Sequence, residues 1–178
     1  MNGRLWAVVG PSGAGKDTLI EAARTALPGL QVVRRVISRP SDAGGEDFEG
    51  VTPAEFSRRL QAGEFALHWQ AHGLHYGIPA AALAPLAAGQ DVLFNGSRKA
   101  LAQTALPGLT VIEVTAPAAV LARRLAARGR ETAEDIAARL ARAAHPLPPG
   151  LAVVTVENGG TLAEGVARFL AVLQPVRA

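Results

Sequence analysis

The segment Gly10-Pro11-Ser12-Gly13-Ala14-Gly15-Lys16 constrains the fold of this chain more than any other feature. The apolar run from Leu5 to Val9 precedes it and predicts a buried strand, and a helical pattern from about Lys16 to Leu27 follows it. In that context the G-x-x-x-x-G-K spacing predicts a phosphate-binding loop, or P-loop. Glycines let successive backbone N–H groups converge on a phosphate, and the helix N-terminus adds partial positive charge. The alternative is a glycine-rich turn with an incidental lysine.

The residue after the lysine departs from the usual P-loop pattern. A Ser or Thr that binds magnesium normally stands there, but this chain has Asp17, with a hydroxyl only at Thr18. A carboxylate is a good hard ligand for Mg²⁺, so we predict that Asp17 contacts the metal. Its alternative role is to stabilise the first helical turn. The candidate nucleotide-binding residues are Gly10, Pro11, Ser12, Gly13, Ala14, Gly15, Lys16, Asp17 and Thr18, with Lys16 also a candidate catalytic residue.

Apolar runs and helical patterns alternate along the remaining sequence of 178 residues. Strands separated by helices pair in parallel through right-handed crossovers. We therefore predict an α/β fold with three layers, a parallel sheet flanked by helices, in a single domain covering residues 1–178. Further strands are expected at 32–37, 91–95, 110–114 and 151–156, and helices at 53–63, 79–88, 117–128, 133–144 and from 161 onward. Thr52 with Glu55 and Thr161 with Glu164 are expected to form capping boxes at two of these helices. Residues 65–77 are expected to be irregular, with short strands around His72-Gly73.

Composition excludes several classes of function. The chain has no cysteine, which excludes a disulfide framework, a thiolate zinc site and a cysteine nucleophile. Aromatic residues make up only 4%, which argues against a stacking platform for single-stranded nucleic acid. The formal net charge is only +3, although 16 of the 18 basic residues are arginine, whose planar fork suits phosphate groups. No apolar run is as long as a membrane-spanning helix, so we expect a protein that does not bind membranes. We also expect it to be cytoplasmic and not to bind nucleic acid.

A cluster of arginines follows the predicted fourth strand of the sheet. Arg124 and Arg128 lie four residues apart on one helical face, where an external anion would relieve their repulsion. Arg130 follows, and Arg142 has no acidic partner one turn away on its helix. We expect a mobile lid at about residues 128–142 whose Arg128, Arg130 and Arg142 neutralise the transferred phosphoryl group. The alternative is a basic surface in solvent.

A second anion site is expected at about residues 34–78. Arg35, Ser38 and Arg39 run off the end of the second predicted strand, and Arg98 follows the third. In an open α/β sheet, ligands bind beyond the carboxyl ends of the strands, so these side chains are candidate substrate-binding residues; loop arginines in solvent are the alternative.

His72 and Tyr76 belong to a segment rich in histidine and aromatic residues, 68–77. We predict that they form polar walls of a sugar or nucleotide pocket and are therefore further candidates for substrate binding. A histidine metal site is the weaker alternative, because no matching cysteine or carboxylate spacing accompanies them.

Taken together, these segments resemble the ribose 1,5-bisphosphate phosphokinases, a branch of the guanylate-kinase-like P-loop kinases. The resemblance spans about residues 4–170. It rests on Gly10 to Asp17, Ile37-Ser38-Arg39-Pro40, Trp69, Ala71-His72-Gly73-Leu74, Tyr76-Gly77, Asp91-Val92-Leu93, Asn95-Gly96-Ser97-Arg98 and Arg128-Gly129-Arg130-Glu131.

The resemblance implies a P-loop nucleotide-kinase fold and an ATP-dependent phosphotransferase that uses Mg²⁺. Its reaction would convert ribose 1,5-bisphosphate to 5-phosphoribosyl 1-diphosphate, and in bacteria the family serves phosphonate breakdown. The attacking group would be a phosphate oxygen, which is already ionised near neutrality because its second pKa is about 6, so no general base is needed. Partners would be these small molecules, and the chain would act as a monomer or homodimer.

Two departures count against guanylate kinase itself. The acceptor loop of guanylate kinases carries a second arginine shortly after the first, whereas none lies between Arg39 and Arg58 here. The tyrosine that follows their Gly-Glu pair is also missing after Gly45-Glu46. A guanylate-type nucleoside monophosphate kinase is nevertheless the nearest alternative, followed by a non-catalytic nucleotide-binding module and, last, a DNA-binding protein.

Overall fold

The computed structural model describes residues 3–42, 46–102, 106–127, 132, 134, 136–138 and 147–174. In this part of the chain the larger sheet has five strands in the order β2-β7-β1-β8-β9, and every neighbouring pair is parallel. The prediction of a parallel sheet flanked by helices is confirmed. The strands are β1 (Leu5–Val9), β2 (Gln31–Val32), β7 (Val92–Asn95), β8 (Leu109–Thr115) and β9 (Ala152–Glu157).

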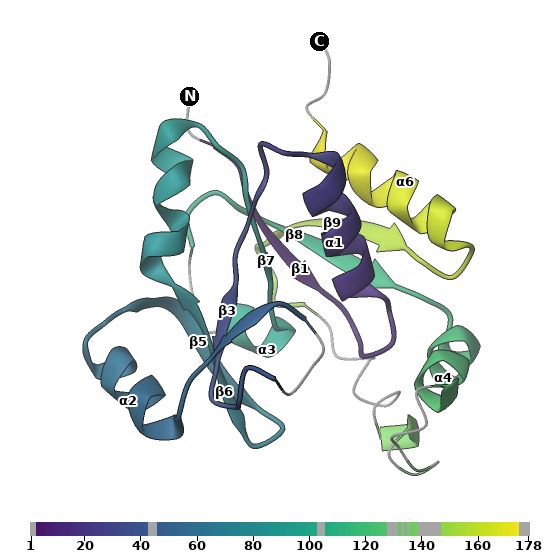
Figure 1. Ribbon diagram of the computed structural model, residues 1–178. Helices are drawn as coiled ribbons and strands as arrows, with labels where there is room; N and C mark the ends of the chain where they lie inside the picture. Colours follow the sequence, from purple (N-terminus) through teal and green to yellow (C-terminus); the bar gives the residue numbers. More distant parts are fainter. Residues whose placement is uncertain are drawn as a thin grey trace.

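Two helices cover one face of this sheet. Figure 1 shows α1 (Lys16–Ala26) and α6 (Leu162–Leu173) against each other over the strands. Alternation along β1 sends Trp6 and Val8 to this face, where they join one buried cluster with Leu19 of α1 and Phe169 of α6. A capping box of Thr161 and Glu164 begins α6, as the sequence predicts.

The opposite face is covered by a mixture of elements. Leu5, Ala7 and Val9 of β1 join a second cluster there. The covering elements are η1 (Ala80–Ala88), α3 (Arg98–Leu101) and the hairpin formed by β5 (Phe65–Ala71) and β6 (Leu74–Pro79). We expected an α-helix at 79–88, but η1 is a 3₁₀-helix, with Pro85 inside it. Proline has no N–H to donate within a helix, which explains the departure from α geometry.

A second sheet, which we did not anticipate, lies beside the first. Its order is β4-β3-β6-β5, with β3 parallel to β4 and antiparallel to β6, and β6 antiparallel to β5. A single strand over 32–37 is therefore wrong: β2 stays in the larger sheet and β3 enters the smaller one. The chain passes from the larger to the smaller sheet just before Arg35, whose largely buried side chain makes an ion pair with Glu46. The strands are β3 (Arg35–Ile37), β4 (Phe48–Gly50), β5 (Phe65–Ala71) and β6 (Leu74–Pro79).

The strands expected around His72-Gly73 are present, but they are longer than predicted: β5 and β6 form a hairpin over most of 65–79, with a register shift between Phe65 and Leu67. Ala71 pairs with Leu74, so His72 and Gly73 alone make the turn. Both have positive φ, 52° and 73°. Two successive residues with positive φ match the strand twist of tight hairpins.

The remaining described helices are short. In α2 (Pro53–Gln61), Thr52 Oγ1 accepts a hydrogen bond from the Glu55 amide at 3.1 Å, as the sequence predicts. The helix predicted at 117–128 is α4 (Ala118–Ala127). Most of the helix expected at 133–144 lies outside the described residues. Within the described ranges, no helix has the length and apolar character needed to span a membrane.

Candidate active site

A cavity of about 680 Å³ lies at the edge of the larger sheet where the parallel strands end. Cavities of 300–1,000 Å³ are typical of small-molecule sites. One end is formed by the P-loop and the start of α1, and the other by the hairpin, the end of β7 and the start of α3. The wall consists of residues 10–13, 15–18, 69–72 and 95–99, with Arg35 and Tyr76.

The P-loop forms the first end of the cavity. Gly10 has φ 150°, and a side chain there would collide with the carbonyl of Val114. Gly15, the N-cap of α1, has φ 90° and no side-chain cap, so the first amides of the helix point to the cavity without competition from a capping side chain. Lys16 Nζ donates to Gly10 O at 2.8 Å and to Pro11 O at 3.1 Å. These features suit the anion binding that we predict for this loop.

Asn158 holds the P-loop in place from outside the cavity wall, and it was not among the predicted site residues. It lies 144 positions from Ala14, yet its Nδ2 donates to Ala14 O at 2.7 Å and its own amide donates to Thr115 O at 2.7 Å. The side chain is buried between two glycines, and a Cβ at Gly15 would lie 2.6 Å from Asn158 Nδ2. Its Oδ1 is buried without a hydrogen-bond partner in the described structure. No local motif could have revealed this contact.

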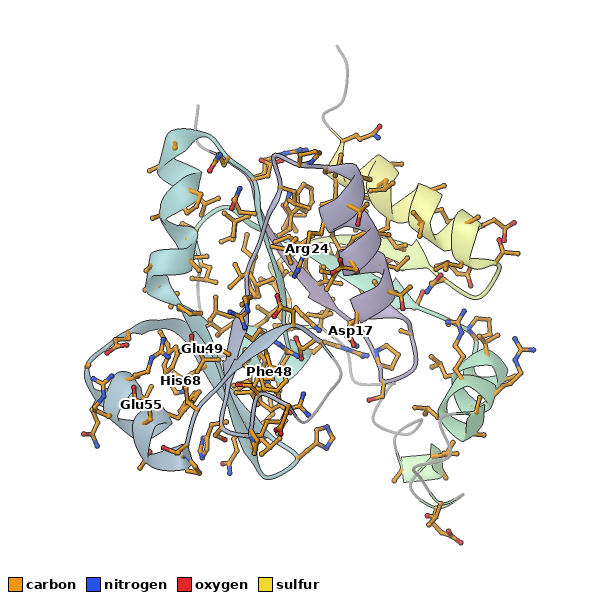
Figure 2. All side chains as sticks on the ribbon, viewed as in Figure 1. Asp17, Arg24, Phe48, Glu49, Glu55 and His68 are labelled. Atoms are coloured by element: carbon orange, nitrogen blue, oxygen red, sulfur yellow. The ribbon has the colours of Figure 1, made fainter. Side chains whose placement is uncertain are left out.

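Asp17 and Asn95 meet at the junction of the two ends of the cavity. Asn95 Nδ2 donates to Asp17 Oδ1 at 2.9 Å, whereas Asn95 Oδ1 is buried without a partner among the described residues. Figure 2 shows Asp17 at the N-terminal end of α1. Carboxylate and amide oxygens are hard ligands, and Mg²⁺ in phosphoryl-transfer sites needs only one or two protein carboxylates beside phosphate and water. The donor set therefore fits Mg²⁺.

Arg35 forms the floor of the second end. Its side chain is only 10% exposed and makes a two-pronged ion pair with Glu46, in which Nε donates at 2.8 Å and Nη2 makes the second bond. Nη1 donates to the backbone oxygen of Asn95 at 3.2 Å. The guanidinium also lies 5.6 Å from the ring of Trp69 and 5.2 Å from that of Tyr76, and these rings stack on each other. Arg35 is thus fixed in place before any ligand binds.

Ser38 and Arg39, two other expected substrate-binding residues, are not part of the cavity wall. The Ser38 hydroxyl accepts from the amide of His75 at 2.8 Å, and its own amide donates to the His75 carbonyl at 3.0 Å. The Arg39 guanidinium lies 4.3 Å from the centre of the Phe48 ring. Ser38 bonds to β6 and Arg39 packs on β4, so both residues hold the smaller sheet together and do not line the cavity themselves.

His72, Tyr76 and Arg98 do lie in the wall, as expected. Arg98 Nη1 is 3.9 Å from a carboxylate oxygen of Glu113. Lys99, for which no role was predicted, also lies in the wall beside Arg98. Among the described residues, no group of three metal-ligating side chains occurs, whether near these histidines or elsewhere.

The expected lid residues Arg128, Arg130 and Arg142 lie outside the described residues. The helix that leads to them is described, and its Arg124 Nη1 donates to Gly13 O in the P-loop at 3.4 Å. This contact places Arg124 of α4 beside the phosphate-binding loop.

Three groups with shifted pKa values, Glu55, Arg58 and Glu164, lie on α2 and α6, away from the cavity. A hydrogen bond from Arg58 lowers the pKa of Glu55, and the same pair raises the pKa of Arg58. The Thr161 amide, by donating to the carboxylate, lowers the pKa of Glu164. The first pair of shifts reports an ion pair on the surface of α2 and the last reports the α6 cap, and none of these groups lines the cavity.

Comparison with curated proteins identifies close relatives, although no family model matches the chain. It is 48% identical over 172 residues to ribose 1,5-bisphosphate phosphokinase PhnN of Agrobacterium fabrum, covering 94% of both chains. It is 49% identical over 182 residues to the protein of the same name from Pseudomonas fluorescens, covering 97% of this chain and 96% of that one.

A second kind of relative is longer. The chain is 52% identical over 175 residues to the bifunctional ribose 1,5-bisphosphokinase-thymidine phosphorylase of Cupriavidus necator. The match covers 97% of this chain and 29% of that protein, so the chain spans under a third of the bifunctional relative.

Solved structures share the fold. Guanylate kinase from Anaplasma phagocytophilum superposes with a TM-score of 0.69 at 19% identity, covering 97% of this chain and 85% of that one. A gluconokinase from Sinorhizobium meliloti gives a TM-score of 0.52 at 23% identity, with 97% and 91% covered. At these identities the likeness establishes the P-loop kinase fold alone.

Proposed function

The chain belongs to the ribose 1,5-bisphosphate phosphokinase family, and we propose that it transfers the γ-phosphoryl group of ATP to ribose 1,5-bisphosphate. The product is 5-phosphoribosyl 1-diphosphate. One observation carries the proposal: a single cavity has phosphate-binding backbone at one end and fixed cations at the other. Two anionic reactants can therefore meet in it.

The nucleotide end holds the triphosphate of ATP. The amides of residues 10–16 and the N-terminus of α1 receive the phosphate oxygens. Lys16 leaves the carbonyls of Gly10 and Pro11, its present hydrogen-bond acceptors, and donates to the transferred phosphoryl group. Asp17, with Asn95 beside it, holds Mg²⁺. When bound, this ion neutralises phosphate charge.

The reaction needs no general base. An oxygen of the acceptor's 1-phosphate attacks the γ-phosphorus, forming a new P–O bond while the bond to the β,γ-bridging oxygen breaks and ADP leaves. The attacking oxygen carries no proton near neutrality, because its second pKa is about 6. Rate acceleration then comes from alignment of the reactants and neutralisation of charge.

The acceptor end positions ribose 1,5-bisphosphate. Arg35, Arg98, His72 and Tyr76 contact the acceptor from the wall, whereas Ser38 and Arg39 act on it through the hairpin and β4 that they hold. The lid residues Arg128, Arg130 and Arg142 close over the nucleotide; the approach of Arg124 to Gly13 supports this assignment. We further propose that the chain acts as a single domain in the cytoplasm, as a monomer or homodimer, and that its reaction is a step of phosphonate catabolism.

A panel of acceptors tests the function. Purified protein is incubated with ATP, Mg²⁺ and either ribose 1,5-bisphosphate, GMP or gluconate, and products are identified by mass. We expect 5-phosphoribosyl 1-diphosphate to form at a kcat/KM at least about 10²-fold above that for either other acceptor. Faster phosphorylation of GMP would assign the chain to nucleotide kinases instead. Transfer to none of the acceptors would favour a non-catalytic module.

A further inference from the structure

Most positive charge at the acceptor end is already paired within the protein. Arg35 is ion-paired with Glu46, and both side chains are largely buried. Arg98 lies 3.9 Å from Glu113, and these two side chains are 14% and 23% exposed. An acceptor with two phosphate groups brings about −1.5 to −2 charges per group near pH 7. The paired arginines offset only part of that charge.

Lys99 differs from these arginines. It lies in the cavity wall in the first turn of α3, and it is exposed rather than buried. Among the described residues it has no ion pair or hydrogen bond with another side chain, so no carboxylate of this part of the chain competes with a ligand for its ammonium group. The chain has only two lysines against 16 arginines, and both lysines, Lys16 and Lys99, line this cavity.

The two lysines are contributed by opposite ends of the cavity. Lys16 belongs to the P-loop, where the reacting phosphate must lie, and Lys99 follows β7 on the acceptor side. The proposed acceptor has a phosphate at each end of its sugar. When one of these phosphates lies at the P-loop, the second phosphate points away from the P-loop. A compact ammonium on a flexible stem suits a phosphate that only needs to be held, not aligned for reaction.

We propose that Lys99 binds the non-reacting 5-phosphate of the acceptor and so selects sugar bisphosphates over sugar monophosphates. This inference rests on the proposed function. Lys99 is in this account a binding residue with no part in the phosphoryl transfer itself, so its removal acts on acceptor affinity and leaves the chemical step intact.

Competitive inhibition by two sugar monophosphates separates the two phosphate positions. Ribose 5-phosphate carries only the group that Lys99 would hold, and ribose 1-phosphate carries only the reacting group. In Lys99→Gln we expect the inhibition constant of ribose 5-phosphate to rise about tenfold, as for loss of one charge-assisted hydrogen bond. That of ribose 1-phosphate stays within twofold. The KM for ribose 1,5-bisphosphate rises about tenfold at unchanged kcat.

Two variants serve as controls. Lys99→Arg keeps the charge and should restore most of the affinity for ribose 5-phosphate. Arg58→Gln removes one positive charge from the exposed face of α2, away from the cavity, and matches the change in net charge. It should alter neither inhibition constant, so an effect confined to Lys99→Gln cannot come from net charge alone.

The outcomes that overturn the inference differ from those that overturn the function. If the wild type converts ribose 1,5-bisphosphate but Lys99→Gln leaves both inhibition constants unchanged, or weakens both inhibitors equally, the role of Lys99 is wrong and the proposed function stands. If the wild type does not convert ribose 1,5-bisphosphate at all, the proposed function and the role of Lys99 are both wrong.

Discussion

The two ends of the cavity are built in different ways. The nucleotide end comes from one contiguous segment, residues 10–18, which presents backbone amides and a helix terminus to the cavity. The acceptor end is assembled from β3, the β5–β6 hairpin and the start of α3, and presents side chains to the cavity, one of which, Arg35, is already held by Glu46. Phosphate binding by backbone tolerates little change in conformation, whereas side-chain recognition can be changed one residue at a time. Substitutions at the two ends should therefore have separable effects.

Lys16→Ala should have the largest effect on activity. Loss of a donor aimed at transition-state charge typically lowers kcat by about 10²- to 10³-fold. We expect the KM for ribose 1,5-bisphosphate to stay within a few-fold, because Lys16 belongs to the nucleotide end. Steady-state kinetics with both substrates check this, with a melting curve to show that the variant folds. A rise in acceptor KM as large as the fall in kcat would contradict the separation of the two ends.

Glu46→Gln should have the largest effect on stability. It leaves the largely buried Arg35 guanidinium without its carboxylate, and breaking a buried pair costs about 3 kcal/mol. Denaturant unfolding measures the loss. The matched control is the adjacent Asp47→Asn: Asp47 is 46% exposed and pairs with Arg34 at 2.8 Å, so the cost should be at most about 1 kcal/mol. Equal losses in the two variants would show that Arg35 is not fixed by Glu46.

Asn158→Ala tests the support of the P-loop. Removing the donor leaves Ala14 O without its hydrogen bond, which should lower the free energy of unfolding by about 1–3 kcal/mol. Because the loop loses its anchor, the KM for ATP should rise while the KM for ribose 1,5-bisphosphate stays constant. A purely structural role would lower stability without shifting the ATP KM, and that result would remove Asn158 from the nucleotide end.

Glu164→Gln should have the smallest effect, visible only in the pH dependence of stability. Hydrogen bonding at the α6 cap lowers the pKa of Glu164 from its ordinary value of 4.5, so its contribution to stability is present above pH 4.5 and disappears as pH falls through the lowered pKa. The melting temperatures of wild type and variant should differ at pH 7 and converge in acid. In a Thr161→Ala background the difference at pH 7 should shrink, since the hydroxyl is gone. A difference that persists unchanged in acid would contradict the cap assignment.

The nucleotide end could be predicted from sequence because its signals are local. The glycines, Lys16 and the flanking strand and helix all lie within residues 5–27. The cap of α6, which lies elsewhere, could be predicted for the same reason, because it needs only Thr161 and Glu164. Asn158 could not be predicted, because its contact with Ala14 depends on how β9 pairs with β8.

The acceptor end was predicted in part. Arg35, His72, Tyr76 and Arg98 were expected in the wall and lie there. The second sheet was missed because its strands β3 and β4 have three residues each, too short for a periodic pattern. Ser38 and Arg39 were expected to face a ligand, but the antiparallel pairing of β3 with β6 directs the Ser38 hydroxyl to the hairpin.

A structure of the ternary complex tests most directly whether both anions share one cavity. The protein would be crystallised with a non-hydrolysable ATP analogue, Mg²⁺ and ribose 1,5-bisphosphate. We predict the triphosphate on the amides of residues 10–16, with the 1-phosphate of the acceptor in line with the γ-phosphorus and its sugar between Arg35 and Arg98. An acceptor bound outside this cavity, or with its 1-phosphate turned away from the P-loop, would contradict the account.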